Sequence, residues 1–380
     1  MRPIFPQSVL KLGAFALGVL IGGSAGGLSA LGAEPEPASA PESRARTEIR
    51  QTYIDEMIKE AWDEAGVKPS RPATDEEFLR RVYLDVIGRT PNIQEAQGFL
   101  GSKEKGKREK LVEYLLNLPD YARNFGTQWT VLLLGRKPQE RQVDREALAS
   151  WVRTQFLDNR PWDRIVFDLV TAKGSNKENG AVNFPLAHLE FGAVPLTSMT
   201  TRLFVGQQIQ CTQCHDHPSN DWKQADFWGM NAFYKGLKRE QVMKADATGA
   251  EVLDHTDLSD SPSDAYAQYD RRNGLVGIAF PRYIDGRKIS QGTDVDRRAE
   301  LGKFIAEPKN MDLARAFVNR MWGHFMNRGF VHPVDDFGSH NPPATPSCST
   351  RWPRSSRRAG TTSRPWCAGS PTARRTTFPA

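Results

Sequence analysis

Residues 75–88, "DEEFLRRVYLDVIG", have the spacing of an amphipathic α-helix. Thr74 or Asp75 can cap its start, because a short polar side chain there accepts a hydrogen bond from a free backbone N–H of the first turn. The spacing places four apolar side chains on the face that we expect to be buried, namely Phe78, Val82, Leu84 and Val86. This segment indicates a helical fold.

The same kind of pattern recurs along most of the chain, interrupted by Pro and Gly. Helices are predicted over residues 47–65, 92–99, 106–118, 121–135, 145–159, 160–172, 199–208, 223–234 and 297–328. Between about 237 and 296 the pattern changes, with a polar loop predicted at 254–264 and a strand, a turn and a second strand at 274–289. We therefore expect a mainly α protein: a multi-helix first domain, a β- and loop-rich connection, and a second α domain.

The N-terminus has the features of a secretory signal peptide. Arg2 and Lys11 supply positive charge, residues 12–32 form an apolar run rich in Gly and Ala, and a small-residue cleavage site precedes Ala33. The alternative is an uncleaved membrane anchor, since the run is almost long enough to span a bilayer. We expect cleavage, export to the periplasm or cell surface, and no integral membrane span afterwards.

The last 36 residues, 345–380, differ in composition from the rest of the 380-residue chain. They contain seven Arg but no Leu, Ile, Val, Met, Asp, Glu or Lys, and such a segment cannot form a core. We hypothesise that the sequence after about Pro343 is translated out of frame. Removing seven arginines from a net charge of +6 gives −1, and removing Arg2 and Lys11 gives −3. The apparent basicity thus does not indicate a nucleic-acid partner.

The stretch "QIQCTQCHDHPSNDW" at 208–222 contains Cys211-x-x-Cys214-His215. Two thiols at this spacing can bond to the two vinyl groups of one haem, and the adjacent imidazole can ligate its iron. The motif therefore predicts covalent haem c with His215 as the proximal ligand. Met230, on the next predicted helix, is a candidate sixth ligand; others are Met199, Met243, His188 and His217. Trp222, Phe227, Trp228 and Phe233 either line the haem or pack in an ordinary core.

Two other interpretations of the motif stay open. Cys211, Cys214, His215 and His217 offer two sulfurs and two nitrogens, which zinc accepts, or the cysteines combine with a distant pair among His324, His332 and His340. In an exported protein the two cysteines can instead form a structural or redox disulfide. Separately, Asp335-Asp336 near His332 suggests metal-assisted hydrolysis, although such a pair is more often a turn or a helix cap.

Several segments resemble a family of large secreted planctomycete proteins with a cytochrome-like domain of unknown function and a second domain of unknown function. "DEEFLRRVYLDVIGRTPNIQEAQGFL", "REKLVEYLLNLPDYARNFGTQW", "NRPWDRIVFDLVTAKG" and the segment around CxxCH resemble the first domain. "ARAFVNRMWGHFMNRGFVHPVDDFGSHNPP" resembles the start of the second. The resemblance implies a truncated second domain.

The expected organisation is a signal peptide (1–32), a linker (33–46), the cytochrome-like domain (47–240), the connection (241–296), the truncated second domain (297–344) and the out-of-frame tail (345–380). The expected function is electron transfer through haem c, with an unknown redox partner. One alternative is a non-redox surface or scaffold protein with a CxxC disulfide. The other is a metal-dependent hydrolase acting on glycans at Asp335-Asp336. Whether the protein is an enzyme stays open.

Overall fold

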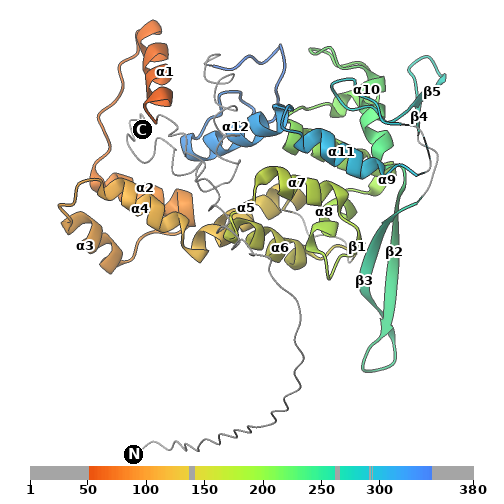
Figure 1. Cartoon of the computed structure of the whole chain (residues 1–380), viewed down its shortest axis with the longest axis horizontal. Helices are drawn as coiled ribbons and strands as arrows, with labels where there is room; N and C mark the ends of the chain where they lie inside the picture. Colours follow the sequence, from red (N-terminus) through yellow and green to blue (C-terminus); the bar gives the residue numbers. More distant parts are fainter. Residues whose placement is uncertain (1–50, 137–141, 262–265, 291, 293, 345–380) are drawn as a thin grey trace, which may run out of the picture. The chain divides into compact units, whose positions relative to one another are not determined.

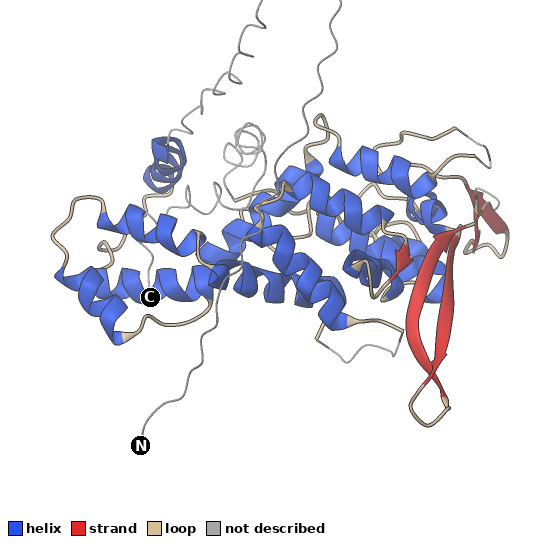
Figure 2. Cartoon of the chain, turned by 60° about the horizontal axis from the view of Figure 1, so that its bottom comes forward, coloured by secondary structure: helices blue, strands red, loops and turns tan. Residues whose placement is uncertain are grey.

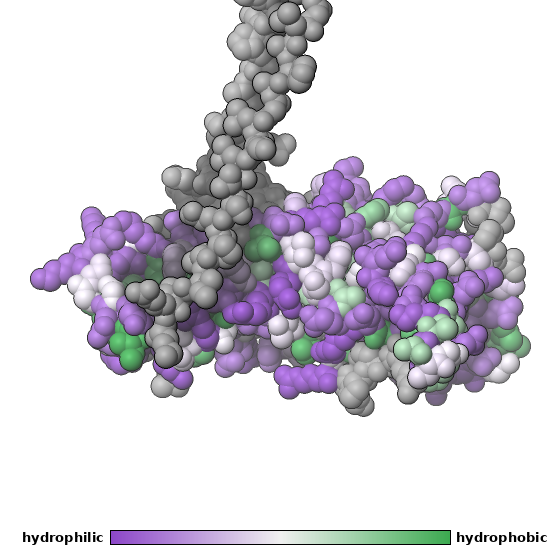
Figure 3. Space-filling model, turned by 90° about the horizontal axis from the view of Figure 1, so that it is seen from below, coloured by the Kyte–Doolittle hydropathy of each residue, from purple (hydrophilic) through white to green (hydrophobic). Residues whose placement is uncertain are grey.

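The computed structural model describes residues 51–136, 142–261, 266–290, 292 and 294–344. The predicted signal peptide (1–32), linker (33–46) and tail (345–380) lie outside these residues. The described part is mainly α, as expected, with only small sheets (Figures 1 and 2). None of its helices is long and apolar enough to cross a membrane. The face shown in Figure 3 is largely hydrophilic, with hydrophobic side chains in small separate groups.

The described α-helices follow the predicted order. They are α1 (Gln51–Glu64), α2 (Asp75–Ile87), α3 (Ile93–Gly101), α4 (Lys107–Leu116), α5 (Pro119–Leu134), α6 (Arg145–Leu157), α7 (Trp162–Thr171), α8 (Asn183–Leu186), α9 (Glu190–Thr200), α10 (Gln224–Asn231), α11 (Arg297–Ala306) and α12 (Asp312–Met326). Short 3-10 or π-helical turns are η1 (Gly180–Val182), η2 (Thr201–Val205), η3 (Gln210–Gln213) and η4 (Ala232–Tyr234).

Two helix starts form full capping boxes. Thr74 Oγ accepts from the Glu77 N–H at 3.3 Å, and the Glu77 carboxylate accepts from the Thr74 N–H at 2.8 Å. Asn92 and Glu95 form the same pair of bonds at the start of α3. Of the side chains expected to be buried on α2, Phe78, Val82 and Val86 are buried and Leu84 is half-buried. The local signals for these helices are therefore confirmed.

One hydrophobic core joins residues from both ends of the described chain. Phe317 on α12 lies 4.9 Å from Trp162 on α7 and 6.2 Å from Trp129 on α5, measured between ring centroids. All three side chains are at most 3% exposed. Aromatic side chains bury large apolar areas, so this cluster stabilises the packing of α12 against the earlier helices. Residues 297–344 thus complete the same core as residues 75–205.

Two small antiparallel sheets lie beside the helices. One has the order β1 (Gly174–Ser175), β3 (Glu251–Asp260), β2 (Leu237–Ala245), and the other pairs β4 (Ala267–Asp270) with β5 (Val276–Ala279). The prediction of a polar loop at 254–264 is wrong for residues 254–260, which belong to β3. β2 is exposed along nearly all its length, so it lacks the alternation that marks a half-buried strand, whereas β3 buries Thr256 and Leu258.

Two predicted helices differ in their bounds. The helix predicted at 199–208 begins earlier, as α9, and ends with the π-helical turn η2 at Val205. The helix predicted at 297–328 is divided into α11 and α12. Pro308 lies in the break, where proline removes a backbone donor and restricts the preceding residue.

Candidate functional site

The chain enters the CxxCH motif through a tight bend at Gly206. This residue ends η2 with φ +76°, a left-handed conformation that favours glycine. Its carbonyl oxygen accepts a hydrogen bond from the Phe337 N–H at 2.9 Å. A Cβ at this position would lie 2.7 Å from Phe337 Cδ2. The bend therefore depends both on backbone conformation and on the absence of a side chain.

Cys211 lies on the short 3-10 turn η3 and Cys214 caps its end, and both are exposed, free thiols. Thr212 between them is fully buried, and its hydroxyl donates to the Ile209 carbonyl at 2.6 Å. The Gln213 carbonyl accepts from Gln224 Nε2 at 3.1 Å and from Trp228 Nε1 at 3.0 Å. The turn is thus anchored at its centre and against α10, while both sulfurs face outward.

His215 follows the turn with one ring nitrogen already engaged. Its Nδ1 lies 2.7 Å from the Asp216 carbonyl oxygen. Because a carbonyl accepts, this Nδ1 carries the proton, and the Nε2 lone pair is left for another partner. Among the described residues, no group hydrogen-bonds that Nε2. The imidazole is therefore held in the tautomer that ligates a metal through Nε2.

His217 has a different role, because its Nδ1 closes a turn. It accepts from the backbone N–H of Ser219 at 3.2 Å and of Asn220 at 3.0 Å. The His217 N–H donates to the Trp222 carbonyl at 2.8 Å. The two histidines, which are two residues apart in sequence, thus differ in their hydrogen bonds: His215 donates through Nδ1, and His217 accepts through Nδ1.

Asp216 joins the motif to the next helix. Its carboxylate accepts from the Gln224 N–H at 3.0 Å, at the start of α10, and lies 3.2 Å from Lys223 Nζ. The bond from the Gln224 backbone, followed by that from Lys223, holds the pKa of Asp216 below its usual value. A carboxylate at a helix N-terminus also interacts favourably with the helix dipole. Asp216 therefore fixes the direction in which the chain leaves His215.

The candidate sixth ligands are spread over the fold. Met230 is fully buried in the hydrophobic core. Met199 packs against the core, and Met243 is 47% exposed on β2. His188 Nε2 lies 2.6 Å from the Leu133 carbonyl, and burial lowers the pKa of its imidazole. Of these candidates, only His217 belongs to the same loop as His215.

The four aromatic candidates divide into two pairs. Phe227 and Phe233 are in the core and at most 1% exposed. Trp222 and Trp228 are half-buried, and the Trp228 ring stacks on Tyr269 at 5.5 Å with an interplanar angle of 5°. Trp228 also donates to the Gln213 carbonyl. Ordinary core packing accounts for the first pair, whereas Trp228 directly supports the CxxC turn.

Asp335 lies in a buried ion-pair network. Its carboxylate oxygens accept from Arg202 Nε at 2.7 Å and Gln208 Nε2 at 2.9 Å, with Arg320 Nη2 at 3.4 Å. Burial opposes ionisation, but the bond from Arg202 and the charge of Arg320 outweigh it, so the pKa of Asp335 lies below its usual value. Asp336 lies 3.2 Å from His340 Nε2. The Asp335 carboxylate is therefore occupied by protein donors.

The distant histidines proposed for zinc each make different contacts. His324 Nε2 lies 3.0 Å from the Asp85 carbonyl oxygen, while His340 lies between Asn220 and Asp336. His332 precedes a cis proline. Among the described residues, no group of three or more His, Cys, Asp and Glu side chains is arranged to hold a metal ion.

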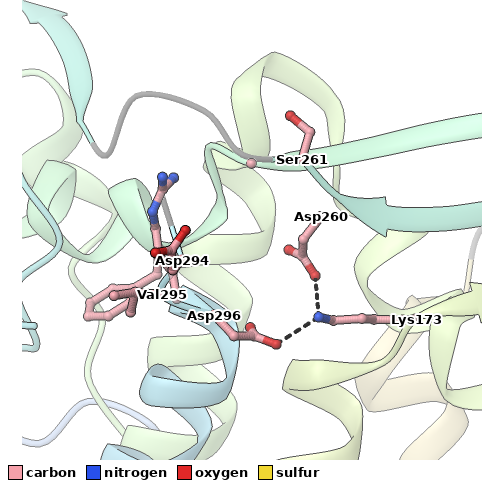
Figure 4. A pocket seen from close by; sticks show the side chains of 9 residues that line it. Lys173, Asp260, Ser261, Asp294, Val295 and Asp296 are labelled. Atoms are coloured by element: carbon pink, nitrogen blue, oxygen red, sulfur yellow. Dashed lines mark hydrogen bonds and ion pairs between the residues drawn. The ribbon is translucent and has the colours of Figure 1, made fainter. Parts of the chain in front are cut away.

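A polar hollow of about 190 Å³ lies at the start of α11, away from the CxxCH motif in sequence (Figure 4). Lys173 Nζ lies 3.1 Å from Asp260 and 2.7 Å from Asp296. Asp260 also binds the guanidinium of the fully buried Arg298, through contacts of 2.8 and 2.6 Å. These opposite charges satisfy one another, so the cluster joins β3 to α11 as a structural ion-pair network.

Comparisons with known proteins agree with the resemblance seen in the sequence. Residues 53–239 match the family model PSCyt2, described as a protein of unknown function (DUF1549). Residues 297–347 match PSD1, described as a protein of unknown function (DUF1553). Neither the curated proteins nor the solved structures contain a match. The chain therefore contains a segment that matches PSCyt2 (DUF1549), at residues 53–239, and a segment that matches PSD1 (DUF1553), at residues 297–347, two families of unknown function.

Proposed function

We propose that this chain is an exported c-type haem protein that transfers single electrons through Cys211, Cys214 and His215. The observation that carries the proposal is the combination of two exposed, free thiols with an imidazole whose Nδ1 is bonded to the Asp216 carbonyl. The thiols are available for covalent attachment. The ring is held in the tautomer that leaves Nε2 free to ligate iron.

The attachment chemistry follows from this arrangement. Cys211 and Cys214 would hold a haem through thioethers, since addition of a thiol to a vinyl group exchanges an S–H bond and a C=C π bond for an S–C and a C–H bond and needs no oxidant. His215 Nε2 would ligate the iron. When bound, haem supplies an iron that accepts and releases one electron. The proposed function therefore breaks no substrate bond.

The surrounding residues would hold this arrangement rather than take part in electron transfer. Gln224 and Trp228 fix the Gln213 carbonyl between the cysteines. Asp216 fixes the chain after His215 through the start of α10. An axial histidine whose Nδ1–H is hydrogen-bonded is a better-oriented and more basic ligand. We therefore assign these residues to orientation of the turn and of the imidazole.

The proposal is tested with the full chain, exported in a host that matures c-type cytochromes. We expect haem staining of the band on a denaturing gel, because thioether bonds survive denaturation. The double variant Cys211→Ser/Cys214→Ser should lose this staining. The matched control is Cys348→Ser/Cys367→Ser, which removes the chain's other two cysteines and should keep it.

The opposite pattern would refute the proposal. A soluble, folded wild-type chain without haem staining would show that the motif does not take haem under maturing conditions. Staining that persists without Cys211 and Cys214 would place the attachment elsewhere.

A further inference from the structure

Residues 335–340, here called the strap, contact the chain on both sides of the CxxCH motif. On the upstream side, the two oxygens of Asp335 accept from Arg202 and Gln208, at 2.7 and 2.9 Å. Gln208 is three residues before Cys211. Asp335 thus links η2 to the segment before the CxxC turn. It follows Arg202 by 133 residues and Gln208 by 127 residues in sequence.

The upstream contact is charged, and its carboxylate is buried. The Asp335 side chain is 5% exposed and its second arginine partner, Arg320, is 10% exposed, whereas Arg202 is 53% exposed. Hydrogen bonds to ionised groups are stronger than neutral ones, and removing one partner of a buried pair leaves an uncompensated charge. The backbone adds a further bond, from the Phe337 N–H to the Gly206 carbonyl. This end of the strap is therefore firmly attached.

The downstream side is held through side chains. His340 Nδ1 lies 3.0 Å from Asn220 Oδ1, and its Nε2 lies 3.2 Å from Asp336. The Asn220 N–H in turn donates to His217 Nδ1. The His217 and His340 rings lie 6.0 Å apart, centroid to centroid. The strap therefore also reaches the turn that follows His215.

We infer that the strap, a part of the PSD1 segment, positions the CxxCH turn of the PSCyt2 domain, with Asp335 as its main positioning residue. Between Gln208 and Asn220 the chain carries the two thiols and His215, and both of these end points are hydrogen-bonded to the strap. The PSD1 segment is thus part of the candidate site rather than a neighbouring module. This inference concerns the protein alone and does not rest on haem attachment.

The test is hydrogen–deuterium exchange of the full chain in its thiol form. In Asp335→Asn, amides of residues 203–223 should exchange several-fold faster, and iodoacetamide should alkylate Cys211 and Cys214 faster at fixed pH. Adding Arg320→Gln should restore part of the protection, because the Arg320 side chain is only 10% exposed and Asp335→Asn leaves its charge uncompensated. A general loss of stability would not be rescued by removing a second hydrogen-bonding group.

The matched control is Asp260→Asn, which breaks another buried Arg–carboxylate pair. It should speed exchange around Lys173 and Arg298 and leave residues 203–223 unchanged. If Asp335→Asn does not fold, the more exposed His340→Ala should still speed exchange in residues 217–222. Equal acceleration at 203–223 in both Asp variants, or no local change in Asp335→Asn and His340→Ala, would overturn the inference. Either result is independent of haem staining.

Discussion

His215→Ala is expected to remove the axial histidine from the haem-bearing chain and with it the low-spin c-type absorption spectrum. The reason is geometric: His215 Nδ1 is committed to the Asp216 carbonyl at 2.7 Å, which leaves Nε2 as the ligating atom. Alanine has no ligating atom. The next imidazole in the sequence, that of His217, already accepts two backbone hydrogen bonds through its Nδ1. Absorbance of the reduced full chain measures the effect, with haem content normalised by staining.

His217→Ala is the control for this prediction. It removes an imidazole two residues away and loosens a turn, but leaves the thiols and His215 in place. Because the His217 ring already accepts from two backbone N–H groups of the turn, we expect that it does not ligate the iron and that the reduced spectrum keeps the c-type bands. If His215→Ala keeps the wild-type spectrum while His217→Ala loses it, the proximal ligand has been assigned to the wrong histidine.

Arg298→Ala is expected to lower the free energy of unfolding by about 3–5 kcal/mol, the cost of breaking a buried ion pair by removing one partner. The Arg298 side chain is fully buried and donates to Asp260, to Val170 O at 3.1 Å and to Ala172 O at 2.8 Å. Alanine leaves the Val170 and Ala172 carbonyls without this donor, leaves Asp260 with Lys173 alone, and leaves a cavity in place of the side chain. Urea unfolding of the thiol-form chain measures the loss.

Arg71→Ala provides the contrast. Arg71 makes a similar two-contact pair with Glu77, at 2.7 and 3.0 Å, but its side chain is 67% exposed. Solvent screens such a pair, so it contributes little. A loss for Arg298→Ala no larger than that for Arg71→Ala would show that burial does not set the strength of the Arg298 network.

The helices were largely predictable because their signals are local. Thr74 with Glu77, and Asn92 with Glu95, are each three residues apart and form the bonds that their types and spacing predict. The β2–β3 hairpin was not predictable by the same means. Leu237–Ala245 is exposed on nearly every residue, so hydrophobic alternation, the main sequence signal of a strand, is missing.

In the candidate site, too, the local features were predictable from the sequence and the long-range contacts were not. The CxxCH motif could be identified from the sequence because its three residues lie within five consecutive positions. Asp335 and His340 contact residues that flank the motif. These partners, Arg202, Gln208 and Asn220, are 120 to 133 residues away in sequence. No local pattern carries that information. Asp335-Asp336 therefore suggested either hydrolysis or a turn, whereas Asp335 in fact binds Arg202 and Gln208.

The most direct test of the account is the mass of one tryptic peptide. Cleavage after Arg202 and Lys223 releases residues 203–223, which contain Cys211, Cys214 and His215. From the full chain exported with c-type haem maturation, the account predicts this peptide with one haem added and no thiol left to alkylate. A peptide lighter by two hydrogens would establish a Cys211–Cys214 disulfide. That mass, or a peptide alkylated at both cysteines, would contradict covalent haem attachment.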